Sequence, residues 1–273
     1  LRPILVQLSG RGFDADPEDL MHAGLAVELL HNFTLVHDDI MDKDDTRHSQ
    51  PTVHEKFGNE AAILAGDSIF TLGQLLIGQV QTNTVQAALA FNKAALAVCA
   101  GQAYDLQFEG AAATTLDQYL DMVEKKTGAL VSLCAEMGGI LGSQSDDVCS
   151  ELQNYGLNLG CAFQVQDDIL EIFSDEENLG KSLDSDVAAE KQTILTVLAR
   201  KHDGWDNIAD SSADVASKRD QMRSFFLETG VHDRAREMSN DYISRAKKSL
   251  SVFAGQHKRN MEQFTNLVLN RTH

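Results

Sequence analysis

The sequence predicts an all-α fold, because prolines are few and strand signals are weak. The 273-residue chain has three prolines, Pro3, Pro17 and Pro51, so none interrupts the sequence after residue 51. Proline removes a backbone donor and clashes with the preceding helical turn, so its absence over this length favours helix. Aromatic residues make up only 6% of the chain, and no sustained alternation of polar and apolar residues indicates strands.

The chain is 43% hydrophobic, which is enough to fill the core of a single helical domain over residues 1–273. No linker, internal repeat or low-complexity tract divides it. It opens at Leu1-Arg2-Pro3 without an initiator methionine, so we expect the true N-terminus to be missing.

The first long helix is predicted over 18–45. Asp16 suits an N-cap, Pro17 suits the first helical position, and two acids follow in the first turn. Polar or glycine-containing breaks, such as Gln81 to Asn83 and Gly142-Ser143, separate the later helices. We expect these helices over 59–80, 84–109, 116–142, 147–173, 186–202, 213–228, 231–253 and 256–270. Within 116–142, Thr127 and Gly128 are poor interior helix residues and predict a kink.

The net charge of −18 restricts the partners. So acidic a chain repels nucleic acids and anionic membrane surfaces. No uninterrupted apolar run reaches the roughly 18 residues of a membrane span, and no signal peptide is visible. The four cysteines form no metal-binding pair and are interpreted as thiols of a reducing cytosol, so we expect a cytoplasmic protein. A phosphate substrate would need a local cationic pocket or bridging metal ions.

A first acidic cluster lies within an apolar helix. Asp38 and Asp42 are one turn apart, on a polar stripe that includes His31 and Thr34. Two carboxylates at this spacing suit Mg²⁺, which prefers oxygen ligands and keeps waters or phosphates in its shell. The alternative is a solvated acidic face, but burial among neighbours such as Phe33 would make unpaired carboxylates costly.

A second cluster repeats this design. Gln164, Asp167, Asp168 and Glu171 are spaced i, i+3, i+4 and i+7, which places them on one helix face. A helical bundle could bring the two clusters together across a cavity. Facing carboxylates could then hold a diphosphate through shared magnesium ions.

Several cations follow these clusters. Arg47 could neutralise a phosphate held by the metals. Lys181 lies in a polar, acidic segment and could contact phosphate from a lid, and Lys191 is similar. Solvated surface positions are an equal alternative for all three residues.

Together these residues resemble the trans-polyprenyl diphosphate synthases. Residues 38–42, DDIMD, match the family's first motif, DDxxD, and residues 163–171, FQVQDDILE, match its second, FQxxDDxxD. Residues 47–54, RHSQPTVH, resemble the R-R-G-x-P-T-x-H segment. Lys126-Thr127 and Gly180-Lys181 match its K-T and G-K steps. The resemblance spans essentially the whole chain, and the two motifs in order are specific.

The resemblance implies an isoprenoid synthase-type helical bundle around a central cavity, assembled as a homodimer. It implies a magnesium-dependent, head-to-tail condensation of isopentenyl diphosphate with an allylic diphosphate. The product would be a short all-trans prenyl diphosphate, farnesyl or geranylgeranyl. The allylic C–O bond would ionise as diphosphate leaves, the isopentenyl double bond would attack the cation, and a proton would be lost.

The resemblance also implies residue roles. Asp38 and Asp42 would bind two of three magnesium ions, and Asp167 the third, helped by Asp168 and Glu171. The allylic diphosphate would be held by Arg47, Lys126, Lys181 and Lys191. Isopentenyl diphosphate would be held by Arg2, His31 and His48. Asp39, Thr127, Gln164 and the Lys126 carbonyl would assist catalysis, the last three through their dipoles. Phe33 and Thr34 would set product length at fifteen or twenty carbons, with twenty favoured.

Three departures from the family pattern keep rivals open. His48 replaces an arginine, Glu171 replaces an aspartate, and the lysine expected before Arg2 is absent. A catalytically weak partner subunit is therefore one alternative. A terpene cyclase on the same fold would carry a different second motif. A di-iron bundle requires two E-x-x-H pairs, and Glu28 to His31 supplies only one.

Overall fold

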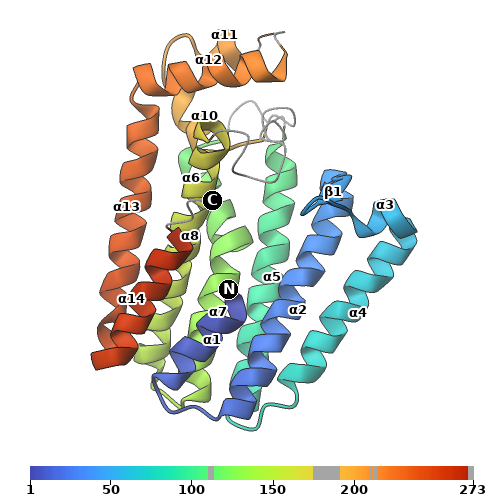
Figure 1. Cartoon of the computed structure of the whole chain (residues 1–273), viewed down its shortest axis with the longest axis vertical. Helices are drawn as coiled ribbons and strands as arrows, with labels where there is room; N and C mark the ends of the chain where they lie inside the picture. Colours follow the sequence, from blue (N-terminus) through green and yellow to red (C-terminus); the bar gives the residue numbers. More distant parts are fainter. Residues whose placement is uncertain (110–113, 175–190, 210, 212–213, 270–273) are drawn as a thin grey trace.

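The computed structural model describes residues 1–109, 114–174, 191–209, 211 and 214–269. Its long helices stand side by side along the long axis of the molecule (Figure 1). The helices are α1 (Arg2–Arg11), α2 (Pro17–Asp42), α3 (Val53–Phe57), α4 (Asn59–Ile77), α5 (Thr84–Phe108), α6 (Leu116–Val123), η1 (Glu124–Gly128), α7 (Ala129–Leu141), α8 (Asp146–Phe173), α10 (Ile194–Ala199), α11 (Trp205–Ala209), α12 (Val215–Glu228), α13 (Val231–Ser249), η3 (Leu250–Val252) and α14 (Gly255–Leu269).

The main contacts follow the order of the helices across Figure 1. Helix α2 packs against α4, α7 packs against α8, and α8 packs against α13. The short α1 lies low in the bundle and contacts both α2 and α7. At the other end, α11 and α12 form the top of the molecule (Figure 1). The predicted all-α architecture is confirmed.

Helix α2 starts as predicted. The Asp16 side chain accepts hydrogen bonds from the backbone N–H groups of Glu18 and Asp19, which satisfies donors that the first turn leaves unpaired. The helix ends at Asp42, three residues earlier than predicted. Lys43 adopts a left-handed conformation with φ of 57°, and its N–H donates to the Asp39 carbonyl, which closes the helix.

The predicted kink in 116–142 is a π turn. Helix α6 leads into η1, a five-residue π-helical segment, and then into α7. Two glycines let the neighbouring helices approach this wide turn. A Cβ on Gly101 of α5 would lie 2.3 Å from the backbone nitrogen of Lys126, and one on Gly160 of α8 would lie 2.8 Å from the Gly128 Cα. The turn carrying Lys126 and Thr127 is therefore held between α5 and α8.

Some elements differ from the prediction. Helix α1 was missed. Within the described part of 186–202, the helix begins only at Ile194, after a Thr193 capping box. A small antiparallel hairpin pairs β1 (Thr46–Arg47) with β2 (Gln50–Pro51). Its turn residues, His48 and Ser49, both have positive φ, which is the geometry that two-residue hairpins favour.

Two hydrophobic clusters fill the bundle. The larger cluster includes Leu20, Phe91 and Tyr155, and the second includes Trp205 and Phe226. Helix α8 contributes to both clusters. The second acidic cluster therefore lies on a helix that is anchored along most of its length.

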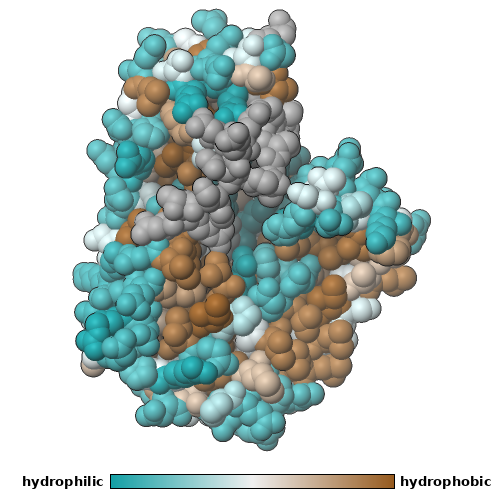
Figure 2. Space-filling model, in the orientation of Figure 1, coloured by the Kyte–Doolittle hydropathy of each residue, from teal (hydrophilic) through white to brown (hydrophobic). Residues whose placement is uncertain are grey.

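Apolar side chains are also exposed on α4 and α5. Ile63, Leu64, Leu72 and Leu75 on α4 are between 46% and 66% exposed. Figure 2 shows hydrophobic surface on the side of the molecule where α4 lies. By length and composition, α4 and α5 are each apolar enough to cross a membrane. Polar residues such as Asp67 in α4 and Lys93 in α5 interrupt their apolar sequences, so neither helix contains the uninterrupted apolar run that the sequence prediction required.

Candidate active site

A cavity of about 380 Å³ lies among α1, α2, α5, η1 and α7. Its lining includes seven of the residues predicted to act in the reaction. These are Arg2, His31, Phe33, Thr34, Asp38, Lys126 and Thr127. Apolar side chains such as Val98 and Leu130 complete the walls, so the cavity combines charged groups with a hydrophobic interior.

The Asp38 carboxyl is crowded and partly removed from water. Its side chain is 21% exposed, and that of Asp42 is 9% exposed. Burial raises the pKa of Asp38 to about 6, with further increases from Asp42 and Asp105 and an opposing effect of Lys126. Such a site favours a bound cation, because positive charge offsets both desolvation and mutual repulsion.

Two lysines meet these acids. The Lys126 ammonium donates a hydrogen bond to Asp105 and lies 4.0 Å from an Asp38 oxygen. Burial opposes the charge on Lys126, but Asp38 and Asp105 raise its pKa. The Lys191 ammonium lies 3.1 Å from an Asp42 oxygen. Both cations therefore lie beside the first acidic cluster, and their contacts to an allylic diphosphate stay a prediction.

Sequence reasoning missed Asp105 and Gln102. Asp105 is 7% exposed on α5 and pairs with Lys126, and the Gln102 amide donates to Asp42 at 3.4 Å. Neither residue belongs to a recognised motif. The available signal was that these two polar residues lie three positions apart, and so on one face, in an alanine-rich helix.

Asp39 and Arg47 pair with each other. Asp39 is 4% exposed, and one of its oxygens accepts from Arg47 Nε at 2.7 Å and lies 2.6 Å from Nη2. Neither residue lines the 380 Å³ cavity. In this structure the pair joins the β1–β2 hairpin to α2. The roles of Asp39 in catalysis and of Arg47 at the diphosphate stay predictions.

The second acidic cluster borders an adjoining pocket. This space of about 90 Å³ is lined by Gln164 and Asp168 of α8 and by Lys126 and Lys191. Lys126 lines both cavities, so the polar faces of α2 and α8 converge on it. Asp167 and Glu171 lie one turn apart on α8 and are half-buried.

Gln164 and Thr127 are joined. The Thr127 hydroxyl donates to the Gln164 amide oxygen at 2.8 Å. This contact brings α8 to the π turn and places two polar oxygens beside the cavity. The sequence predicted dipolar roles for both residues, and the structure brings them together.

Two of the three residues predicted to bind isopentenyl diphosphate line the cavity, and the third does not. Arg2 and His31 both line the cavity, and burial, together with Arg2 and Arg47, lowers the pKa of His31 to about 3. At neutral pH His31 is therefore an uncharged donor or acceptor, and Arg2 supplies the charge. His48 is exposed at the hairpin turn and does not line this cavity. Lys181 lies outside the described residues.

The donor set suits a metal that is shared with a substrate. Among the described residues, no three acidic, histidine or cysteine side chains converge to hold an ion by themselves. Asp38 and Asp42 instead offer two carboxylates one turn apart on α2. Mg²⁺ binds through one or two carboxylates and takes its other ligands from waters and phosphates, so these residues fit it.

Comparisons with known proteins agree with this geometry. Residues 1–224 match the family model described as polyprenyl synthetase. A geranylgeranyl diphosphate synthase of Methanosarcina mazei is 36% identical over 256 residues, covering 92% of this chain and 79% of that protein. The crystal structure of a geranylgeranyl pyrophosphate synthetase from Pyrococcus horikoshii Ot3 superimposes with a TM-score of 0.91 at 32% identity, covering 99% of this chain and 85% of that one.

A polyprenyl synthase from Caulobacter crescentus CB15, solved with calcium and isoprenyl diphosphate, has a TM-score of 0.89 at 26% identity. The match covers 100% of this chain and 84% of that one. That protein therefore carries calcium and isoprenyl diphosphate on a similar fold.

Proposed function

Because the chain belongs to the polyprenyl synthetase family, we propose that its cavity holds an allylic diphosphate between the acids of α2 and α8. The chain is a prenyltransferase that condenses isopentenyl diphosphate with an allylic diphosphate. One observation carries the proposed placement. Lys126 lines both cavities, and Lys191 lines the smaller cavity and contacts Asp42, so these two cations lie between the acids of α2 and Asp168 of α8.

Magnesium is the proposed cofactor. Asp38 and Asp42, together with Asp167 and Glu171, would hold the ions, and the family resemblance supports three of them. Bound Mg²⁺ neutralises the diphosphate and makes it a better leaving group.

The protein's own groups provide the rest of the chemistry. Lys126 and Lys191 bind and orient the diphosphate through their positive charges. The Gln164 and Thr127 oxygens direct their dipoles toward the allylic carbon, where positive charge develops as the C–O bond ionises. The apolar walls, including Val98 and Leu130, exclude water that would otherwise trap the cation.

Isopentenyl diphosphate would bind near Arg2 and His31. Arg2 can form paired hydrogen bonds to a diphosphate, and neutral His31 can donate one more. His48, at the exposed hairpin turn, does not line this part of the cavity.

The rival functions are less well supported. A catalytically weak partner subunit would not need to keep Lys126 beside Asp38 and Lys191 beside Asp42. A terpene cyclase is disfavoured because the similar proteins are prenyl diphosphate synthases.

Product analysis tests the function directly. Purified protein is incubated with labelled isopentenyl diphosphate and, separately, dimethylallyl, geranyl or farnesyl diphosphate, with Mg²⁺ or with a chelator. We expect label in a longer prenyl diphosphate only when Mg²⁺ is present. Failure to incorporate label with any starter would contradict the proposal, and incorporation with chelator would contradict the magnesium requirement.

We further propose geranylgeranyl diphosphate as the product. Phe33 lines the cavity and packs against Phe70 at a ring distance of 5.1 Å and against His37 at 4.9 Å. This aromatic cluster would stop the growing prenyl chain. The neighbouring Thr34 also lines the cavity, and its small side chain leaves space for the prenyl chain.

Replacing Phe33 with alanine tests the proposed stop. We expect Phe33→Ala to add at least one five-carbon unit to the main product, because the side chain that ends the cavity is removed. Chromatography of the dephosphorylated products measures this. Phe57→Ala, at a 64% exposed position on α3, is the control and should leave the product unchanged. Unchanged product length in Phe33→Ala would exclude Phe33 as the stop.

The proposed assembly is a homodimer. The exposed apolar side chains of α4 continue onto α5, where Val85, Leu89 and Leu96 are 55% to 72% exposed. The two helices contact each other. Exposed apolar side chains on neighbouring helices are typical of an interface, and a second copy of the chain would bury them. A cytoplasmic location stays a prediction from the sequence.

A further inference from the structure

The Asp168 carboxylate is bound within the protein. It is 5% exposed, and both of its oxygens accept hydrogen bonds. One oxygen accepts from the Tyr119 hydroxyl at 2.5 Å and from the backbone N–H of Ile194 at 2.8 Å. The other accepts from the Gln164 amide nitrogen at 3.0 Å.

These bonds join three segments. Tyr119 lies on α6, Gln164 lies on α8, and Ile194 is the first residue of α10. Tyr119 is 1% exposed and Ile194 is fully buried. The oxygen that they share therefore faces the protein interior.

The hydrogen bond from Ile194 to Asp168 bears on the position of Lys191, the cation assigned to the allylic diphosphate. Ile194 follows Lys191 by three residues, and Lys191 lies 3.1 Å from Asp42. Gln192 and Thr193, between them, are buried. Fixing the Ile194 N–H therefore fixes the short segment from which Lys191 reaches into the site.

The hydrogen bond from Gln164 to Asp168 fixes the orientation of the Gln164 amide. A carboxylate only accepts hydrogen bonds, so the Gln164 NH₂ group must face Asp168. Its amide oxygen then faces Thr127, from which it accepts the 2.8 Å hydrogen bond. Asp168 thus decides which end of the Gln164 amide is presented beside the cavity.

We propose that Tyr119 and Asp168 form a buried clamp that positions Lys191 and Gln164, and that Asp168 acts through them rather than as a direct ligand of Mg²⁺. Tyr119 is a positioning residue that belongs to none of the recognised motifs. The inference rests on the proposed function, because it assigns Lys191 to the allylic diphosphate.

The first test removes one hydroxyl. Tyr119→Phe keeps the ring but loses the hydrogen bond to Asp168. We expect the KM for the allylic diphosphate to rise roughly tenfold, which is the scale of one hydrogen bond to a charged group. The KM for isopentenyl diphosphate should change less than about twofold, because Arg2 and His31 do not touch the clamp.

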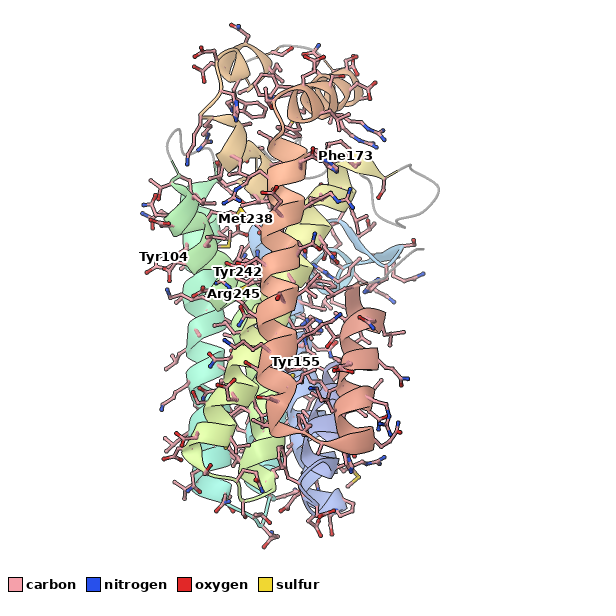
Figure 3. The ribbon with its side chains drawn as sticks, turned by 90° about the vertical axis from the view of Figure 1, so that its left-hand side faces the viewer. Tyr104, Tyr155, Phe173, Met238, Tyr242 and Arg245 are labelled. Carbon is pink, nitrogen blue, oxygen red and sulfur yellow. The ribbon has the colours of Figure 1, made fainter. Side chains whose placement is uncertain are left out.

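Tyr155→Phe is the matched control. Tyr155 is also fully buried on α8, and its hydroxyl lies 2.9 Å from Thr265. Figure 3 shows it in the lower half of the bundle, far from Phe173 at the end of α8. Both variants should lower the unfolding temperature, but Tyr155→Phe should keep the wild-type KM for both substrates. Equal kinetics in the two variants would overturn the proposal.

The second test separates positioning from metal binding. Calorimetry measures how much Mg²⁺ is needed for inorganic diphosphate to bind, without any turnover. Asp167→Asn should raise the half-saturating Mg²⁺ concentration at least tenfold, whereas Asp168→Asn should change it less than about twofold. An equal rise in both variants would show that Asp168 is a direct ligand.

The outcomes also separate the clamp from the function itself. Wild-type protein that makes no prenyl diphosphate would contradict the proposed function. An active wild type with an unaltered Tyr119→Phe variant would contradict only the clamp.

Discussion

His31 shows how its surroundings set a residue's charge. It lies in the cavity with Arg2, and its pKa is lowered to about 3 by burial and by Arg2 and Arg47. An unfolded histidine titrates near 6.5. Between these two values the unfolded chain binds a proton at His31 that the folded chain does not, so this residue lowers stability as the pH falls from about 6.5 towards 3.

We therefore predict that acid destabilises the His31→Gln variant less than it destabilises the wild type. Its free energy of unfolding should fall less steeply than that of wild type between pH 6 and pH 4. The difference in slope should approach about 1.4 kcal/mol per pH unit, which corresponds to one proton. Urea unfolding at several pH values measures the slopes, and parallel curves would contradict the assignment.

Arg47 and Asp39 show that a motif residue can have a structural partner. Asp39 is the second aspartate of residues 38–42, but its bonds go to Arg47 on the β1–β2 hairpin. Adjacent positions on a helix point about 100° apart, so Asp38 can face the cavity while Asp39 faces the hairpin.

At the scale of an element, the π turn η1 has the greatest effect on the site. It carries Lys126 and Thr127 and is enclosed by α5 and α8, where Gly101 and Gly160 allow close backbone approach. π turns inside α-helices occur frequently at functional sites. Here the turn lies between α6 and α7, and its Lys126 lines both cavities.

Gly101→Ala should disturb this turn. Its new Cβ would lie 2.3 Å from the backbone nitrogen of Lys126, so α5 and η1 must separate. We expect a loss of about 1–3 kcal/mol in the free energy of unfolding and a marked fall in kcat. Thermal unfolding and steady-state kinetics measure both.

Gly78→Ala is the control for this substitution. Its Cβ would meet no atom closer than 3.4 Å, and its φ of −66° suits alanine. Its stability and kcat should stay near wild type. A Gly101→Ala protein that behaves in the same way would show that the turn tolerates displacement.

At the scale of the whole molecule, the apolar surface of α4 and α5 contrasts with a net charge of −18. Charge of this size keeps proteins apart. An interface that forms despite it must bury apolar area, and the leucines of α4 supply such area on one side of the molecule (Figure 2).

We predict that Leu72→Glu with Leu75→Glu dissociates the proposed homodimer, because a carboxylate buried in an apolar interface is costly. Analytical ultracentrifugation should show the mass of two chains for wild type and of one chain for the variant. Leu227→Glu on α12, at a position 55% exposed, is the control and should stay dimeric. A wild type with the mass of one chain would contradict the assembly.

Much of this architecture could be predicted from the chain alone. The cap at Asp16, the proline-free helices and the kink near Thr127 follow from local preferences. Local preferences did not predict helix α1 or the later start of α10. Arg2–Arg11 is stabilised by packing against α2 and α7, and Ile194 is fixed by Asp168, which lies 26 residues earlier.

The sequence by itself determined the chemistry available to this protein. It supplied carboxylates one turn apart in two apolar helices, cations after them, and the family to which they belong. Periodicity along a helix is local, so these features can be read without coordinates. Only the tertiary structure decided the partners. Lys126 pairs with Asp105, Arg47 with Asp39, and Asp168 with Tyr119, because packing brings together side chains whose separation along the chain does not indicate whether they touch.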